Sequence, residues 1–126
     1  MKKLTKAQQK KNLRLEAKKL DKAWATTVKD LANWKCAIPG CKVEKRLNAH
    51  HIIPREIKTF RWDYDNGLCL CPKHHRFSFQ FSAHQNPFTF MLWFKGDRPE
   101  QYLRILDKWI SYLSNIKNEI SKDSTI

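Results

Sequence analysis

The sequence lacks any long hydrophobic run. No stretch approaches the ~20 apolar residues of a membrane span, and the lysine-rich beginning is followed by mixed polar sequence, unlike a signal peptide. We therefore expect a protein of the reducing cytoplasm. Four cysteines near several histidines then favour metal binding over disulfide bonds.

Acidic residues are also scarce. The chain has 12 Asp and Glu against 25 Lys and Arg, so its net charge is +13. The excess lies at the front, because residues 1–35 carry 11 basic and 3 acidic residues while residues 78–126 carry 6 and 5. Such a surface is typical of proteins that bind a polyanion, most often nucleic acid. Solubility, or attraction to an anionic membrane, is the alternative, although no hydrophobic anchor accompanies the charge.

The length of 126 residues favours a single domain spanning 1–126. Residues 1–35 are expected to form a basic helical arm, since Thr5 and Gln8 have the spacing of a capping box. Apolar residues recur at steps of three and four from Leu13 to Leu31, which predicts one buried helical face. The basic face either lies along phosphates or is simply solvated.

Residues 83–126 are predicted to form the C-terminal helices. The first runs from Pro87 to Phe94 and is apolar nearly all round, so we expect it to be largely buried. The second takes Asp97 as its N-cap. Its apolar stripe from Tyr102 to Ile120 is expected to pack on the first long helix, but the heptad spacing leaves self-association open. Residues 121–126 look frayed.

Three thiols and one imidazole have the spacing of a zinc site. Cys36 and Cys41 flank a Pro-Gly turn that aims both sulfurs at one point, and Cys71 with His74 follows 30 positions later. Cys69 is the competing ligand, because it alternates with Cys71 in an extended segment. It lies deeper in an apolar run, and we interpret it as a core residue. Four buried free thiols are the structural alternative.

Two pairs of adjacent histidines lie on predicted elements, one pair on a strand and one on a helix. Residues 47–53 and 68–70 can form two short strands, followed by a helix from 72 to about 81. Neighbours on a strand point to opposite sides, so His50-His51 can serve two different sites. Neighbours on a helix lie about 100° apart, so His74-His75 can do the same.

The central segment resembles the HNH endonucleases, which are ββα-metal nucleases. The resemblance rests on Ala49-His50-His51, on Asn66 and on Cys71-x-x-His74-His75, and it covers residues 36–76. More loosely, residues 81–87 and the helix that follows are similar to small phage-borne members. The resemblance implies a mostly helical α+β fold. A ββα-metal core with a structural zinc knuckle would occupy residues 36–82, between long N- and C-terminal helices.

The resemblance also implies a role for each motif residue. His51 matches the general base, and Asn66 matches the residue that fixes the loop between the strands. His50 and His75 match ligands of one catalytic divalent cation, commonly magnesium. Members with a third metal histidine carry it where this chain has Phe79, so two protein ligands are expected. The structural zinc would be held by Cys36, Cys41, Cys71 and His74.

We therefore predict a metal-dependent endonuclease that hydrolyses phosphodiester bonds of double-stranded DNA by a one-metal mechanism. Arg55, Arg61 and Arg76 are candidate phosphate contacts, although each is as readily an ordinary surface arginine. His84 could reach the cleft, but capping or packing is the preferred interpretation. A homodimer through the last helix stays open, and the expected location is the cytoplasm, that of the host if the chain is phage-encoded.

Two rival functions use the same residues in part. A zinc-stabilised nucleic-acid-binding module would need the zinc ligands and the basic arm, but not His51. The second rival is a metal-dependent ribonuclease or a structure-specific resolvase, and nothing in the sequence excludes either. The adjacent histidines and His75 favour catalysis, because zinc binding alone does not require them.

Overall fold

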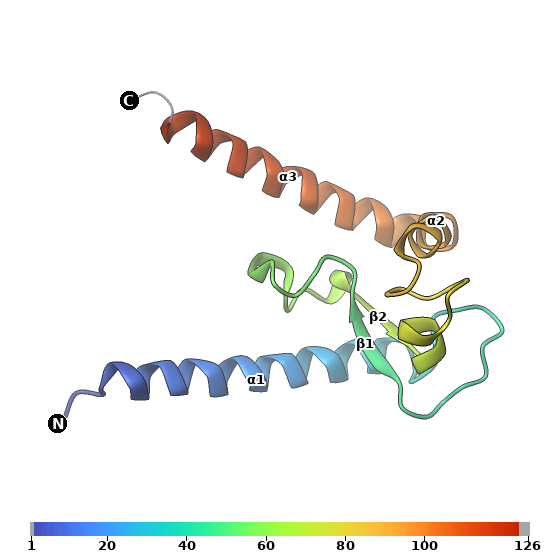
Figure 1. Cartoon of the computed structure of the whole chain (residues 1–126), viewed down its shortest axis with the longest axis horizontal. Coiled ribbons are helices and arrows are strands. Elements are labelled where there is room, and N and C mark those ends of the chain that lie inside the picture. The colour runs from blue at the N-terminus through green and yellow to red at the C-terminus, as the bar shows by residue number, and fades with distance from the viewer. Residues whose placement is uncertain (1, 124–126) are drawn as a thin grey trace.

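The structure is a computed structural model that describes residues 2–123, and it is mostly helical with a small antiparallel hairpin at its centre (Figure 1). In the view of Figure 1, α1 and α3 lie on opposite sides of the hairpin, and one end of each helix projects beyond it. This arrangement confirms the predicted α+β fold with a ββα core. The elements are α1 (Lys6–Leu31), β1 (Asn48–His51), η1 (Lys58–Phe60), η2 (Tyr64–Asn66), β2 (Gly67–Leu70), η3 (Lys73–Phe77), α2 (Pro87–Asp97) and α3 (Pro99–Asp123).

Helix α1 begins with the predicted capping box. The Thr5 side chain accepts a hydrogen bond from the Gln8 amide at 3.1 Å, and the Gln8 side chain accepts one from the Thr5 amide at 2.8 Å. The predicted apolar face is buried only near the end of the helix, at Trp24 and Val28. Leu13 is 73% exposed, because the first half of α1 extends past the body of the protein (Figure 1).

The hairpin pairs β1 with β2, with Asn48 opposite Leu70 and His51 opposite Gly67. Helix α1 packs directly on this hairpin. A Cβ atom at Gly67 would clash with the side chains of Val28 and Trp24, so the close approach of α1 to β2 requires glycine here. All four residues of β2 are buried.

The predicted helix over residues 72–81 is much shorter in the structure. Only η3 forms, as a single π-helical turn, in which the Ser78 amide donates to the Lys73 carbonyl at 3.0 Å. The chain then folds back along η3. The Ala83 amide donates to the His74 carbonyl at 2.9 Å, and the His84 amide donates to the His75 carbonyl at 3.0 Å. These carbonyls would bond residues 78 and 79 in a longer helix, so the returning chain replaces the missing turns.

Helix α2 has the predicted start but not the predicted burial. The Asn86 side chain caps it by accepting a hydrogen bond from the Thr89 amide at 3.1 Å. Only Phe90 and Phe94 are buried, whereas Phe88 and Leu92 are exposed, so the expectation of a largely buried helix is wrong. The predicted N-cap of the next helix is also wrong, because Asp97 is the last residue of α2 and α3 begins at Pro99.

We expected the apolar stripe of α3 to pack on α1, and this expectation is wrong. Helix α3 packs on α2 and on the loop between the strands, where Ile105 forms a buried cluster with Ile53 and Phe60. An ion pair between Lys108 and Asp63, at 2.6 Å, fastens α3 to the same loop. Within the described residues, the first half of the stripe, as far as Trp109, therefore packs on the loop between the strands.

The far part of α3 carries exposed apolar residues, namely Ile110, Leu113 and Ile120. The helix continues to Asp123, so residues 121–123 are helical, and the expectation of fraying at 124–126 lies outside the described residues. Among the described residues, no helix is long and apolar enough to cross a membrane.

Candidate metal centres and active site

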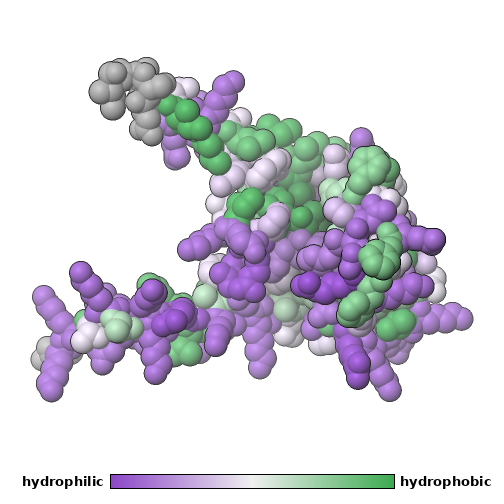
Figure 2. All heavy atoms as spheres, in the orientation of Figure 1, coloured by the Kyte–Doolittle hydropathy of each residue, from purple (hydrophilic) through white to green (hydrophobic). Residues whose placement is uncertain are grey.

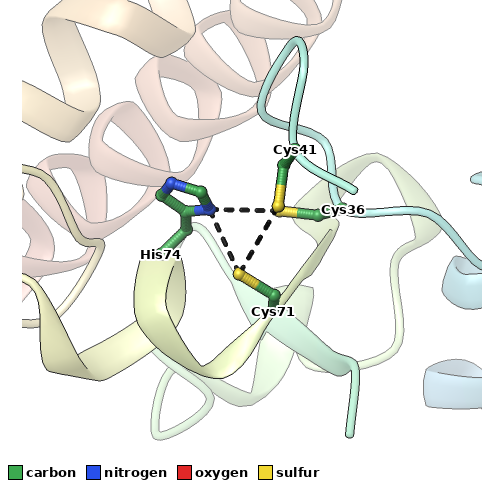
Figure 3. A group of neighbouring side chains, drawn as sticks. All are labelled: Cys36, Cys41, Cys71 and His74. Carbon is green, nitrogen blue, oxygen red and sulfur yellow. Dashed lines mark hydrogen bonds between the residues drawn. The ribbon is translucent and has the colours of Figure 1, made fainter. Parts of the chain in front are cut away.

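Three cysteines and one histidine converge beside η3, as the sequence predicts (Figure 3). Cys36 and Cys41 come from the loop after α1, Cys71 follows β2, and His74 lies in η3. The Sγ atoms of Cys41 and Cys71 are 3.8 Å apart, and His74 Nδ1 lies 3.5 Å from Cys36 Sγ and 3.1 Å from Cys71 Sγ. Cys69 is not part of this group and is buried in the core, which confirms its interpretation.

The spacing of these atoms fits a tetrahedral zinc ion. Ligand atoms about 2.3 Å from such an ion lie about 3.8 Å from one another, close to the distances in the group. Burial raises the pKa of the Cys36 thiol to about 12, so this sulfur does not ionise by itself at neutral pH. A bound cation would supply the charge that turns such thiols into thiolates. The donor set and the geometry therefore suit zinc.

A second cluster contains His50 of β1, His75 of η3 and His84 of the returning segment. One nitrogen from each ring lies within 4.8 Å of the others, and the Nε2 atoms of His75 and His84 are 3.0 Å apart. Two neighbouring ligands of an octahedral cation with ~2.1 Å bonds are separated by about 3.0 Å, so the spacing suits a small divalent cation. Burial lowers the pKa of His50 to about 3 and that of His75 to about 4, which keeps these rings neutral and able to bind metal.

The third histidine of this cluster was not predicted as a ligand. Only two protein ligands were expected, because the family's third position is Phe79 here, and that side chain is 79% exposed and outside the cluster. His84 is the third member of the cluster, because the returning chain runs beside η3 and the His84 amide donates to the His75 carbonyl. His84 therefore reaches the cavity, which was the less favoured alternative, and it also packs against the rings of His50 and His75. Spacing along a helix gives no signal for it, since the connection is a fold-back and not a helical turn.

His51 points to the other face of β1, away from His50, as the strand alternation predicts. Its ring stacks on Trp24 with the centroids 3.9 Å apart and the planes 10° from parallel. Its Nε2 lies 2.9 Å from the carbonyl oxygen of Arg61. A carbonyl only accepts, so Nε2 carries the hydrogen and Nδ1 keeps the lone pair. Burial also lowers the pKa of His51, so the ring is neutral at pH 7 and can accept a proton at Nδ1.

Asn66 is completely buried and joins the two ends of the loop between the strands. Its Oδ1 accepts from the Ile53 amide at 2.6 Å, and its Nδ2 donates to the carbonyls of Ile53 and Phe60 at 3.0 and 3.1 Å. Every polar atom of the side chain is therefore used to close this loop. The same loop carries the Arg61 carbonyl that bonds His51. Asn66 therefore contacts His51 only indirectly, by closing the loop that presents this carbonyl.

The histidines of both faces open on one cavity of about 560 Å³. Arg55 and Arg76 line it as well, and their role as phosphate contacts stays a prediction. Arg61 does not line it, because its guanidinium donates from Nε and Nη2 to both carboxylate oxygens of Asp21 at 2.8 and 2.5 Å. Arg61 is committed to this ion pair, and we correct its interpretation from phosphate contact to structural residue. The four histidines at the cavity are His50, His51, His75 and His84.

The comparison with known families agrees with this geometry. Residues 36–85 match the family model described as HNH endonuclease. The matched segment contains the hairpin and both clusters of potential metal ligands, so the match supports an HNH endonuclease segment within this chain. This segment indicates nuclease activity in general and a nucleic-acid substrate, and nucleases of this kind typically use a divalent metal. No curated protein and no solved structure matches the chain.

Proposed function

We propose that the protein is a divalent-metal-dependent DNA endonuclease that hydrolyses phosphodiester bonds with one catalytic cation and with His51 as the general base. One observation carries the proposal. A neutral imidazole with a free Nδ1 and a separate three-histidine cluster project from neighbouring residues of β1 and line the same cavity. Zinc-supported binding without catalysis would need neither the free imidazole nor the second cluster.

In this proposal His51 takes a proton from a water molecule at Nδ1, and the water oxygen attacks the scissile phosphorus while the bond from phosphorus to the leaving oxygen breaks. The proton then leaves His51 to solvent, which the cavity admits. The Arg61 carbonyl holds the other ring nitrogen in its N–H form throughout. Asn66 supports this arrangement by closing the loop that presents the carbonyl.

The catalytic cation would be held by His50 and His75, and we now add His84 as a third ligand. When bound, such an ion polarises the phosphoryl group and neutralises the charge of the leaving oxygen. Magnesium is the cation we propose for the cell. Imidazole ligands also suit manganese, nickel and zinc, so these ions are reasonable substitutes in vitro. The structural zinc would lie at Cys36, Cys41, Cys71 and His74.

Double-stranded DNA is the proposed substrate, bound by the basic surface. Hydrophilic side chains predominate on the projecting part of α1 (Figure 2), and residues 1–35 hold 11 of the 25 basic residues. Arg55 and Arg76 lie at the cavity wall, where they would contact the phosphates beside the scissile bond.

We further propose that two copies pair through the exposed apolar stripe of α3, and that the protein acts in the cytoplasm.

Plasmid cleavage tests the proposal. Supercoiled DNA is incubated with wild type and with His51→Ala, each with magnesium, with manganese or with a chelator. Wild type should produce nicked or linear plasmid only with a cation. His51→Ala should cleave at least about 100-fold more slowly, because general-base catalysis typically contributes that much. Its DNA affinity should remain that of wild type.

The same experiment separates the rival functions. Retardation of DNA by wild type without cleavage, under every metal condition, would favour the zinc-stabilised binding module. Cleavage of RNA but not of plasmid would favour a ribonuclease, and cleavage of branched DNA alone would favour a resolvase. Full activity of His51→Ala would remove His51 as the base.

A further inference from the structure

We propose that Trp24 and Asp21 of α1 are positioning residues for His51. They lie one helical turn apart, so their side chains share one face of α1. The inference rests on the proposed function, since it assumes that His51 is the base. It gives α1 a second task besides carrying basic charge, because this helix would also fix the orientation of the catalytic imidazole.

Trp24 fixes the plane of the His51 ring. The two rings are stacked at 3.9 Å, and the tryptophan is only 3% exposed. The indole itself has little freedom. Its Nε1 donates to the Asp63 carbonyl at 2.8 Å, and another part of its ring abuts the backbone of Gly67. A buried ring held at two points provides a rigid wall, so His51 cannot tilt toward α1.

Asp21 fixes the acceptor that determines the direction of His51 Nδ1. Its carboxylate accepts from Arg61 and, at 2.9 Å, from the Trp62 indole Nε1. These bonds tie the backbone around Arg61 to α1. The carbonyl of the same Arg61 accepts from His51 Nε2. If this peptide moves, the imidazole either loses its acceptor or turns within its plane, and the direction of Nδ1 changes with it.

The two constraints are complementary. Stacking leaves the ring free to rotate in its own plane, and a single hydrogen bond leaves it free to tilt. Together they leave one orientation for Nδ1. The cation ligands are on the opposite face of β1, so disturbing Trp24 or Asp21 should alter proton transfer without disturbing metal binding. A misplacement of about 1 Å can cost about 100-fold in rate.

Site-directed variants test this inference on the full-length, zinc-loaded protein. Trp24→Leu removes the aromatic wall, Trp24→Phe keeps a ring for stacking, and Asp21→Asn weakens the tie to Arg61. The chain offers a matched control on the same helix, because the Trp34 indole donates to the Asp30 carboxylate at 2.7 Å on the exposed surface. Trp34→Leu and Asp30→Asn therefore change the same residue types away from His51.

The measurements are kcat and KM for a labelled DNA duplex at saturating manganese, together with the thermal unfolding temperature. For Trp24→Leu we expect kcat to fall by about 10- to 100-fold while KM stays nearly unchanged. Trp24→Phe should recover most of the loss, since the stack persists. Asp21→Asn should give an intermediate fall in kcat. Both controls should keep the kcat of wild type.

Several results would overturn the inference. A folded Trp24→Leu protein with the kcat of Trp34→Leu would do so, as would a fall in kcat that Trp24→Phe does not relieve. If Trp24→Leu does not fold, Asp21→Asn decides, and a kcat equal to that of Asp30→Asn refutes the positioning role. Failure here is distinct from failure of the proposed function, which would appear as inactive wild type or as active His51→Ala.

Discussion

His50 and His51 are neighbours in the sequence, but their side chains have different surroundings. Strand geometry sends His50 toward two other imidazoles and His51 toward an indole and a carbonyl. Burial lowers the pKa of both rings, so both are neutral at pH 7 and each has an unprotonated nitrogen. The different contacts of that nitrogen, and not a difference in charge, separate the proposed metal ligand from the proposed base.

At the residue scale, His84 allows a sharp prediction about the catalytic cation. Replacing it with alanine should lower the affinity for manganese at least about 10-fold, since even the loss of a supporting contact to a ligand has that effect. Calorimetric titration of the zinc-loaded protein measures this without any cleavage assay. Phe79→Ala is the control, because Phe79 has the family's ligand position but is exposed. Equal affinities for His84→Ala and Phe79→Ala would exclude His84 as a ligand.

At the scale of elements, local signals predict more than long-range ones. The capping box of α1, the two strands and the separate sites of His74 and His75 follow from spacing within a few residues. The single turn of η3 does not, because it depends on hydrogen bonds from Ala83 and His84 farther along the chain. The partner of α3 was also missed, since a heptad stripe fits many apolar surfaces and does not specify one.

The zinc knuckle is the element whose stability we can predict. Cys36→Ser should lower the zinc content and the unfolding temperature together, because a structural zinc contributes roughly 10–16 kcal/mol in small domains. Cys69→Ser is a matched control, since Cys69 is also buried but lies outside the cluster. It should lower the unfolding temperature only through the buried hydroxyl and keep the zinc. Elemental analysis after dialysis, with thermal unfolding, distinguishes the two. Full zinc content in Cys36→Ser would contradict the assignment.

At the scale of the whole molecule, the charge divides between the two projecting helices. Residues 1–35 hold most of the excess positive charge, whereas residues 99–123 carry 4 basic and 4 acidic residues. Figure 2 shows hydrophilic atoms over the projecting end of α1 and a run of hydrophobic atoms along α3. The two projections therefore suit different partners. A polyanion fits α1, and an apolar surface, such as that of a second copy, fits α3.

The salt dependence of DNA binding tests this division. We expect a triple variant with Lys10, Lys11 and Lys18 changed to glutamine to bind DNA more weakly. We also expect the slope of log affinity against log salt to flatten by ~0.9 for each phosphate contact that is lost. These lysines precede Asp21 on α1 and do not line the cavity, so the kcat at saturating DNA should change little. Lys117→Gln on α3 is the control, since it removes a charge from the neutral helix and should leave the slope as it is.

Fluorescence anisotropy of a labelled duplex across salt concentrations provides the measurement. An unchanged slope in the triple variant would mean that the projecting half of α1 does not touch phosphate, and the bound DNA would then have to be held by the charges around the cavity alone.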